Sequence, residues 1–427
     1  MPKRSTDELF QLVKSLEKAE KRNFKLFVQR NATSSDMKTV QLFDALDKLE
    51  DYDEEALLKR NTDIKKQQLS NLKAHLYRQI LASLRILKDD NNIQLQLHEL
   101  MDYSRILYDK GLYLQSLKTL DRVKEYAREQ HQVTYWLQTL IFEKKIEALY
   151  ITRSMENRAE TLAKEVEEAG DRLTMMNKLS NLSLQLYSWY INLGHARGDK
   201  DRIAIKAFFE SNLPTTAGLY NGFYEKHYLY ESYCWYGFIL RDLLMYYRYC
   251  QKWVDAFEQE PLMKKVDTPL YIKGLHNLLN AHFVLQNYDK FNTVLDKFEH
   301  FYHSKQANSN DNNRVQCFIY LYTAKLNKHF LEGSFTAGLK LIPEIEEKII
   351  EFRLKMDRHR VLVFYYKIAC LYFGSGDNEK AIEYLNRIIN WKVDLRTDLQ
   401  CYSRLLHLIA HYELGNYDLL EYLVKSV

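Results

Sequence analysis

The chain has 427 residues, and its 46% hydrophobic and 28% charged side chains are typical of globular proteins and not of disordered ones. It contains only 13 glycines and 5 prolines, which argues against sandwiches, barrels and Rossmann folds, because these folds need such residues in their turns. The net charge of +4 is too small to indicate nucleic-acid binding by itself. The composition predicts an all-α protein.

Cysteine usage and the N-terminal sequence favour a cytoplasmic location. The five cysteines are widely spaced and form no Cys-x-x-Cys pair, so the sequence favours free thiols over disulfides or a zinc ribbon. Residues 1–10 contain no apolar segment of the kind that secretory signals carry. The longest uncharged run, 179–196, is too polar to span a bilayer, and we expect a helix that is buried on most sides.

Residues 1–90 are predicted to form a small helical N-terminal domain. Asp7 and the polar residues beside it can cap a first helix, because their side chains accept hydrogen bonds from the free N–H groups of a first turn. Two further helices are expected around Phe24 and Phe43, separated by a polar break at 31–36. A longer helix follows, and its apolar stripe consists of Leu69, Leu72, Leu76, Ile80, Leu84 and Leu87.

From residue 92 onward, pairs of amphipathic helices recur. In each pair a first helix ends at a Gly or Asn turn, and a second helix follows. A small residue in each helix, such as Ser104 and Ser116, lets the two helices approach closely. The predicted turns lie at Gly111, Gly198, Asn287, Gly333, Gly376 and Gly415. The two widest gaps predict further turns near Ser154 and near 247–250.

This pattern resembles the tetratricopeptide repeat (TPR), most closely around Gly111 and Gly376. The mean period of about 43 residues is longer than the 34 residues of that family. The resemblance covers about residues 92–427 and implies a right-handed α-solenoid of TPR-like helical hairpins with a concave binding surface. The expected divisions are the N-terminal domain 1–90, a first repeat block 91–212, an irregular aromatic-rich helical middle 213–270 with a loop at 213–222, and a second repeat block 271–427.

No motif for catalysis stands out. The chain has no P-loop, no dinucleotide-binding fingerprint, no nucleophile elbow and no HExxH metal motif. Two histidine pairs, His300 with His303 and His407 with His411, have spacing that suits a metal ion, but no third ligand is placed obviously beside either pair. We therefore expect neither an enzyme nor a cofactor nor a metal site.

Aromatic residues gather between positions 220 and 253, where they make up 13 of 34 residues against 13% of the whole chain. One interpretation is bulky core packing between long helices. The other is an aromatic groove that grips a peptide, with arginines for its carboxylates, or that stacks on single-stranded bases. The candidate contact residues of such a groove are Tyr233, Tyr236, Arg241, Tyr247 and Arg248.

The resemblance and the missing catalytic motifs favour a non-enzymatic scaffold or adaptor that binds a protein or peptide partner on the concave face of the repeats. The alternative is a TPR-type regulator whose basic N-terminal domain contacts nucleic acid or an effector protein. Its contact residues would be Lys21, Arg22 and Lys25, although the domain lacks a clear helix-turn-helix pattern.

Overall fold

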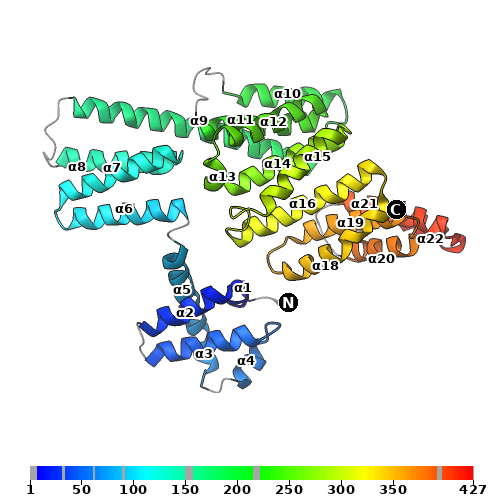
Figure 1. Cartoon of the computed structure of the whole chain (residues 1–427), viewed down its shortest axis with the longest axis horizontal. Helices are drawn as coiled ribbons and strands as arrows, with labels where there is room; N and C mark the ends of the chain where they lie inside the picture. The colour runs from blue at the N-terminus through cyan, green and yellow to red at the C-terminus, as the bar shows by residue number, and fades with distance from the viewer. Residues whose placement is uncertain are drawn as a thin grey trace. The chain divides into compact units, whose positions relative to one another are not determined.

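The fold is helical throughout the part of the chain that the computed structural model describes, which confirms the all-α prediction (Figure 1). The described residues are 7–30, 34–60, 63–88, 92–149, 157–214, 222–391 and 397–426. The chain divides into two compact units: unit 1 contains Met1–Ala127 and Gln138–Glu156, and unit 2 contains Arg128–Leu137 and Asn157–Val427. Within the described residues, no helix has both the length and the apolar character that crossing a bilayer requires.

Unit 1 begins with five helices around a core of their own. They are α1 (Glu8–Ser15), α2 (Lys18–Arg30), α3 (Ser34–Lys48), α4 (Glu54–Arg60) and α5 (Lys66–Lys88). Asp7 starts α1 as predicted, because its carboxylate accepts from the backbone N–H groups of Leu9 and Phe10 at 3.0 and 3.2 Å. Phe24 and Phe43 meet in the core with ring centroids 4.7 Å apart. Helix α3 begins inside the predicted polar break.

Three further helices follow: α6 (Ile93–Asp109), α7 (Tyr113–Glu129) and α8 (Val133–Leu149). Ser104 of α6 and Ser116 of α7 are both buried, and their hydroxyl oxygens lie 3.0 Å apart. The small side chains therefore let the two helices approach closely, as the sequence predicted. The first unit extends past the expected boundary at residue 90, whereas the core of α1–α5 contains buried residues only up to Ile80.

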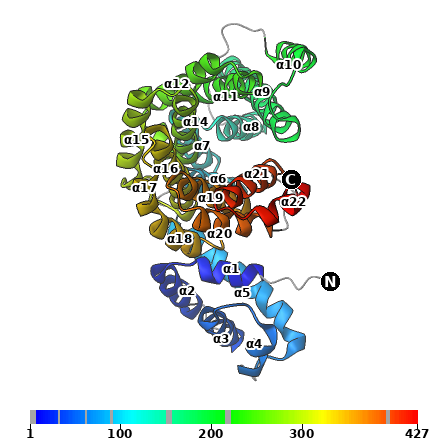
Figure 2. The same ribbon diagram turned by 90° about the vertical axis from the view of Figure 1, so that its right-hand side faces the viewer.

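Unit 2 is a succession of packed helices. They are α9 (Arg158–Leu193), α10 (Asp199–Asn212), α11 (Phe223–Leu240), α12 (Leu243–Gln259), α13 (Met263–Val266), α14 (Thr268–Val284), α15 (Tyr288–Tyr302), α16 (Asp311–Glu332), α17 (Phe335–Gly338), the 3-10 turn Leu339–Leu341, α18 (Ile342–Glu351), α19 (Arg358–Gly374), α20 (Asn378–Ile389), α21 (Thr397–Glu413) and α22 (Tyr417–Ser426). Helices α14, α16 and α19 follow one another side by side, and α15 and α20 pair with α14 and α19 (Figures 1 and 2).

Three turns in unit 2 use one residue for two purposes. The backbone N–H of this residue donates to the carbonyl five positions earlier and so closes the first helix. Its side chain accepts from the backbone N–H three positions later and so opens the next helix. The residues are Asp242, Asn287 and Asp377. Because of this chemistry, antiparallel helices follow each other with very few linking residues.

Four of the predicted turn glycines have the left-handed backbone that only glycine adopts without strain, and these predictions are confirmed. They are Gly111, Gly333, Gly376 and Gly415, with φ between 66° and 86°. The turn predicted at Asn287 is also present, where Gln286 takes the left-handed conformation and Asn287 caps α15.

One predicted turn is present but ends its first helix at another residue, and one predicted turn is wrong. Gly198 lies in the turn between α9 and α10, but the left-handed residue that ends α9 is Gly194, with φ 75°, and Gly198 is extended. No turn lies within 247–250, because α12 runs through this segment, and the chain reverses earlier at Arg241 with φ 57°. Arginine rarely takes this conformation, so its presence at position 241 does not predict a turn. The turn near Ser154 and most of the loop 213–222 lie outside the described residues.

The run 179–196 is not buried on most sides, which corrects a second expectation. It forms the end of α9, a single helix of 36 residues. One face, with Leu182 and Leu186, is buried, whereas Leu184 and Ile191 on the other face are 64% and 52% exposed. The polar residues of the run thus belong to an ordinary amphipathic helix.

The double role of Asp377 predicts a specific loss of stability. Asp377→Ala removes the side-chain acceptor of α20, and we expect it to lower the free energy of unfolding by about 1 kcal/mol in urea denaturation. Asp377→Asn keeps an acceptor oxygen and the backbone N–H, so it should retain most of that stability. If Asp377→Asn and Asp377→Ala lowered the free energy of unfolding equally, the side-chain cap of α20 would not contribute to stability.

Candidate functional site

The candidate site lies on three neighbouring helices, α14, α16 and α19, which together present side chains in rows. The first row contains His276, Tyr320 and Arg360, one from each helix. The rings of His276 and Tyr320 are stacked with centroids 4.1 Å apart. The Arg360 guanidinium carbon lies 5.3 Å from the Tyr320 centroid, and an Arg360 N–H donates to the Tyr320 hydroxyl at 3.4 Å. Each residue of this row thus touches the next.

The second row lies seven residues further along every helix and contains Phe283, Asn327 and Lys367. The ammonium of Lys367 donates to the side-chain carbonyl of Asn327 at 2.6 Å. It also lies 5.9 Å from the Phe283 centroid and 5.4 Å from that of Phe330. Seven residues make two helical turns, so both rows fall on the same side of each helix. The three helices are therefore parallel and in register.

Lys273 adds a third cation one turn before His276 on α14. Its ammonium lies 3.9 Å from a carboxylate oxygen of Glu231 on α11 and 5.9 Å from the Trp235 ring centroid. Burial raises the pKa of Glu231, although Lys273 and a hydrogen bond from Ser183 oppose that shift. The carboxylate is thus a poorly hydrated partner for a half-buried lysine.

Burial lowers the pKa values of His276 and Lys367 in this region. Burial, together with the charges of Arg360, Lys273 and Lys367, lowers the pKa of His276 to about 3, so its ring is neutral at physiological pH. Burial lowers the pKa of Lys367 to about 8. Among the described residues, neither Arg360 nor Lys367 forms an ion pair with a carboxylate. We call Lys273, Arg360 and Lys367 the cation cluster.

This arrangement is suited to binding an anionic group. Arginine and lysine donate charge-assisted hydrogen bonds to carboxylates and phosphates, and such bonds strengthen where water is partly excluded. The cluster has three cations and one neighbouring carboxylate, that of Glu231, so its net charge is positive. This charge attracts a ligand that carries negative charge. The rings of Tyr320, Phe283 and Phe330 provide apolar contact beside it.

Two of the five residues predicted as peptide contacts pack against other rings. Tyr236 is buried and stacks on Phe209 with centroids 4.1 Å apart. Tyr233 is half-buried and stacks on Tyr249 at the same distance. Both rings are therefore largely engaged in packing between helices.

The remaining three predicted contacts are Arg241, Tyr247 and Arg248. Arg241 is the exposed left-handed residue that ends α11, and Arg248 is exposed on α12. The Tyr247 ring lies 5.0 Å from that of His282, with the Lys290 ammonium above it at 5.5 Å. Of the twelve described aromatic residues in 222–253, four are buried, namely Phe223, Tyr236, Tyr246 and Trp253, and the other eight are half-buried. Much of the aromatic density is thus core packing.

Two of the three basic residues predicted for the N-terminal patch are paired with acids. Lys21 contacts the Asp47 carboxylate at 2.6 Å, and Lys25 contacts Asp44 at 2.7 Å. Arg22 is exposed. The ion pairs with α3 therefore offset part of the positive charge of α2.

The histidine pairs have no metal-binding surroundings, because no group of three or more potential ligands occurs among the described residues. The rings of His407 and His411 contact each other edge to face with centroids 4.5 Å apart. Burial and the neighbouring His411 lower the pKa of His407 to about 4, so the pair is neutral.

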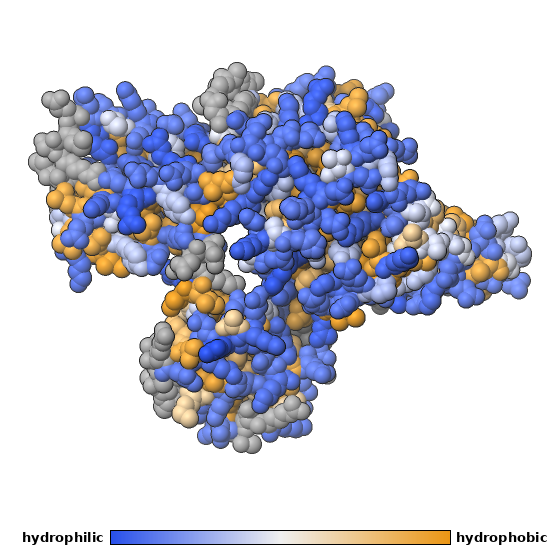
Figure 3. Space-filling model, viewed as in Figure 1, coloured by the Kyte–Doolittle hydropathy of each residue, from blue (hydrophilic) through white to orange (hydrophobic). Residues whose placement is uncertain are grey.

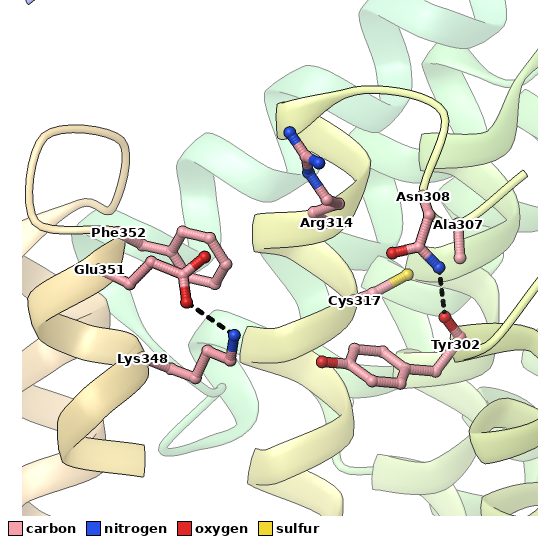
Figure 4. A pocket seen from close by; sticks show the side chains of 8 residues that line it. All are labelled: Tyr302, Ala307, Asn308, Arg314, Cys317, Lys348, Glu351 and Phe352. Carbon is pink, nitrogen blue, oxygen red and sulfur yellow. Dashed lines mark hydrogen bonds and ion pairs between the residues drawn. The ribbon is translucent and has the colours of Figure 1, made fainter. Parts of the chain in front are cut away.

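A small cavity of about 80 Å³ lies between α15, α16 and α18 (Figure 4). The cations that line it have their own partners, since Lys348 contacts Glu351 at 2.6 Å and Arg314 contacts Asp311. Burial raises the pKa of the Cys317 thiol to about 12, so that this sulfur is not a nucleophile at neutral pH. The cavity therefore offers neither a free charge nor a reactive group.

No protein-family model matches the chain, and no curated protein matches it significantly. The cation cluster was missed in the sequence, because its members come from two helices more than 80 residues apart. One signal was present: Lys367 is the single charged residue between Val361 and Gly376. A lone lysine in such an apolar helix indicates a charged side chain that is at least partly buried.

The lowered pKa of Lys367 predicts a pH-dependent stability. The unfolded chain holds this proton with the ordinary lysine pKa of 10.5, whereas the folded chain releases it at about 8. The free energy of unfolding should therefore rise between pH 8 and 10.5 by more in the wild type than in Lys367→Met. Urea denaturation across this range checks it, with the exposed Lys206→Met as control. Parallel profiles for wild type and Lys367→Met would contradict the expectation.

Proposed function

We propose that this chain is a non-enzymatic scaffold that binds an acidic segment of a partner protein at the cation cluster. The observation that carries the proposal is the excess of three cations over one carboxylate on neighbouring helices. Lys273 and Lys367 are half-buried and therefore not fully hydrated, whereas Arg360 is exposed. A carboxylate-bearing ligand can form charge-assisted hydrogen bonds with all three at this surface. The fixed rows of side chains pre-organise it for binding.

We also propose that unit 2 is a right-handed TPR-like solenoid. The supporting observations are the shared turn chemistry of Asp242, Asn287 and Asp377 and the parallel register of α14, α16 and α19. Corresponding residues of the first row are 44 and 40 residues apart, close to the period of about 43 in the sequence and longer than the family's 34. Repeat arrays with this connectivity commonly bind extended segments along their first helices.

An acidic peptide fits the surface better than a nucleic acid does. The cluster consists of three cations in a setting of aromatic and amide side chains, whereas a nucleic acid needs a longer basic track along its backbone. The Lys21 and Lys25 ion pairs further reduce the charge that such a track would need.

The proposal predicts charge-dependent peptide binding. A fluorescein-labelled peptide of alternating alanine and glutamate should bind the full chain, and its glutamine counterpart should bind more weakly in fluorescence anisotropy. Arg360→Gln and Lys367→Met should each lower the affinity for the glutamate peptide by about tenfold or more. The reason is that a hydrogen bond to a charged group contributes roughly 1.5–3 kcal/mol.

Lys206→Met, which removes an exposed lysine from α10, serves as the matched control and should bind as the wild type does. Equal affinities for the two peptides, or unchanged affinity in both cluster variants, would refute the proposal. Circular dichroism of each variant separates loss of binding from loss of fold.

A further inference from the structure

A large apolar surface lies on the hairpin of α21 and α22. One face of α21 is buried and contains Leu399, Ser403, His407 and Ala410. The opposite face exposes Tyr402, Leu405, Ile409 and Tyr412, which are 58%, 39%, 46% and 56% accessible. Their spacing of three or four residues places them in one stripe along the helix. This helix is thus apolar on two faces, and only one of them is covered.

Helix α22 is only partly covered, although six of its ten residues are apolar: Leu420 and Leu423 are half-buried, and the other apolar residues are exposed. None of the residues whose burial is described in α22 is buried. Tyr417, Leu419, Tyr422 and Val424 are 48–74% accessible. In Figure 3, apolar side chains appear in orange among paler residues at this end of the chain. The helix ordinarily expected at the end of a repeat array has a polar outer face, and α22 does not.

The earlier helices of unit 2 show what such a face normally contacts. Helix α14 packs against α16, α16 against α19, and α19 against α21. Each of them therefore has a later first helix beside it. Within the described residues, α21 has no equivalent neighbour, and its stripe lies open to solvent.

The exposed apolar area is at the upper end of what a monomer leaves in water. The four side chains of the α21 stripe lie beside Tyr417 of α22, since the ring centroids of Tyr412 and Tyr417 are 5.7 Å apart. Val424 is seven residues from Tyr417 and so falls on the same side of α22. At about half exposure and roughly 200 Å² for each large side chain, these six present roughly 600 Å². The largest apolar patch of a monomer is about 300–600 Å², and a standard interface buries about 800 Å² on each partner, so the patch suits a dimer with an interface below the standard size.

The charge pattern favours an identical partner. No Asp, Glu, Lys or Arg lies between Arg404 and Glu413, so the stripe of α21 is uncharged. On α22, Glu421 and Lys425 form an ion pair with each other at 2.9 Å. Two copies can therefore face each other about a twofold axis through the uncharged stripe, with the exposed Glu413 and Asp418 at its edge. The aromatic and aliphatic composition matches that of homodimer interfaces.

We propose that the chain forms a symmetric homodimer in which α21 and α22 of one copy pack against α21 and α22 of a second copy. The stripe from Tyr402 to Tyr412 would form the centre of this interface. The proposal is independent of the acidic-peptide function, since the cation cluster belongs to other helices.

Cys401 provides a natural reporter, because it is next to Tyr402 and is the one exposed cysteine of the five. In the dimer its thiol should be shielded, so labelling by a maleimide should slow as protein concentration rises through the dissociation constant. The rate should not change with concentration in a variant that stays monomeric.

The decisive experiment is sedimentation equilibrium of the full chain up to about 100 μM. We expect twice the 51.1 kDa mass of the chain for the wild type. The double variant Leu405→Asp with Ile409→Asp should weaken dimerisation at least 100-fold, and Tyr417→Glu on α22 should weaken it independently. Ile350→Asp, at an equally apolar position of α18 that is 69% exposed, should leave the dimer unchanged.

Circular dichroism shows whether each variant folds, and Tyr417→Glu keeps the test valid if the double variant does not. A wild type that remains monomeric overturns the proposal, even if another protein then covers the hairpin. A dimer that survives both sets of substitutions, with Cys401 labelled at the same rate at all concentrations, overturns it as well.

Discussion

The tight reversal of the chain between antiparallel helices is the constraint on which the rest of unit 2 depends. A reversal within so few residues leaves the last carbonyls of one helix and the first N–H groups of the next without helical partners. At Asp242, Asn287 and Asp377 a single residue satisfies both ends. Because these links are short, each second helix has to lie against its first helix, and the next pair follows on the same side.

The register of the first helices follows from that packing. Once α14, α16 and α19 are parallel neighbours, residues seven apart on each of them form rows across all three. The rows bring Arg360 beside Tyr320 and Lys367 beside Asn327, and both cations lack a carboxylate partner among the described residues. Holding an ammonium in partly apolar surroundings costs stability, which the lowered pKa of Lys367 reflects. An anionic ligand would offset this cost.

Packing accounts for much of the aromatic segment. Tyrosines on α11 and α12 fill the spaces between long helices, as the Tyr233–Tyr249 and Tyr236–Phe209 stacks show. The cation cluster differs, because Arg360 and Lys367 have no carboxylate partner among the described residues, and Lys273 has Glu231. A lysine such as Lys367 in an apolar helix is an informative signal, because packing does not offset the desolvation cost of its charge.

Local chemistry was sufficient to predict much of this protein from sequence. The scarcity of glycine and proline indicated helices, Asp7 marked the start of α1, and the left-handed glycines at 111, 333, 376 and 415 marked helix ends, since each of these signals acts within a few residues. The turn at Arg241 was not predictable in this way, because neighbouring helices impose a conformation that arginine does not favour. Likewise, the meeting of His276, Tyr320 and Arg360 and the open face of α21 depend on which helices become neighbours. Tertiary structure alone decided these, because contacts between residues 40 or more positions apart depend on how all the intervening helices pack.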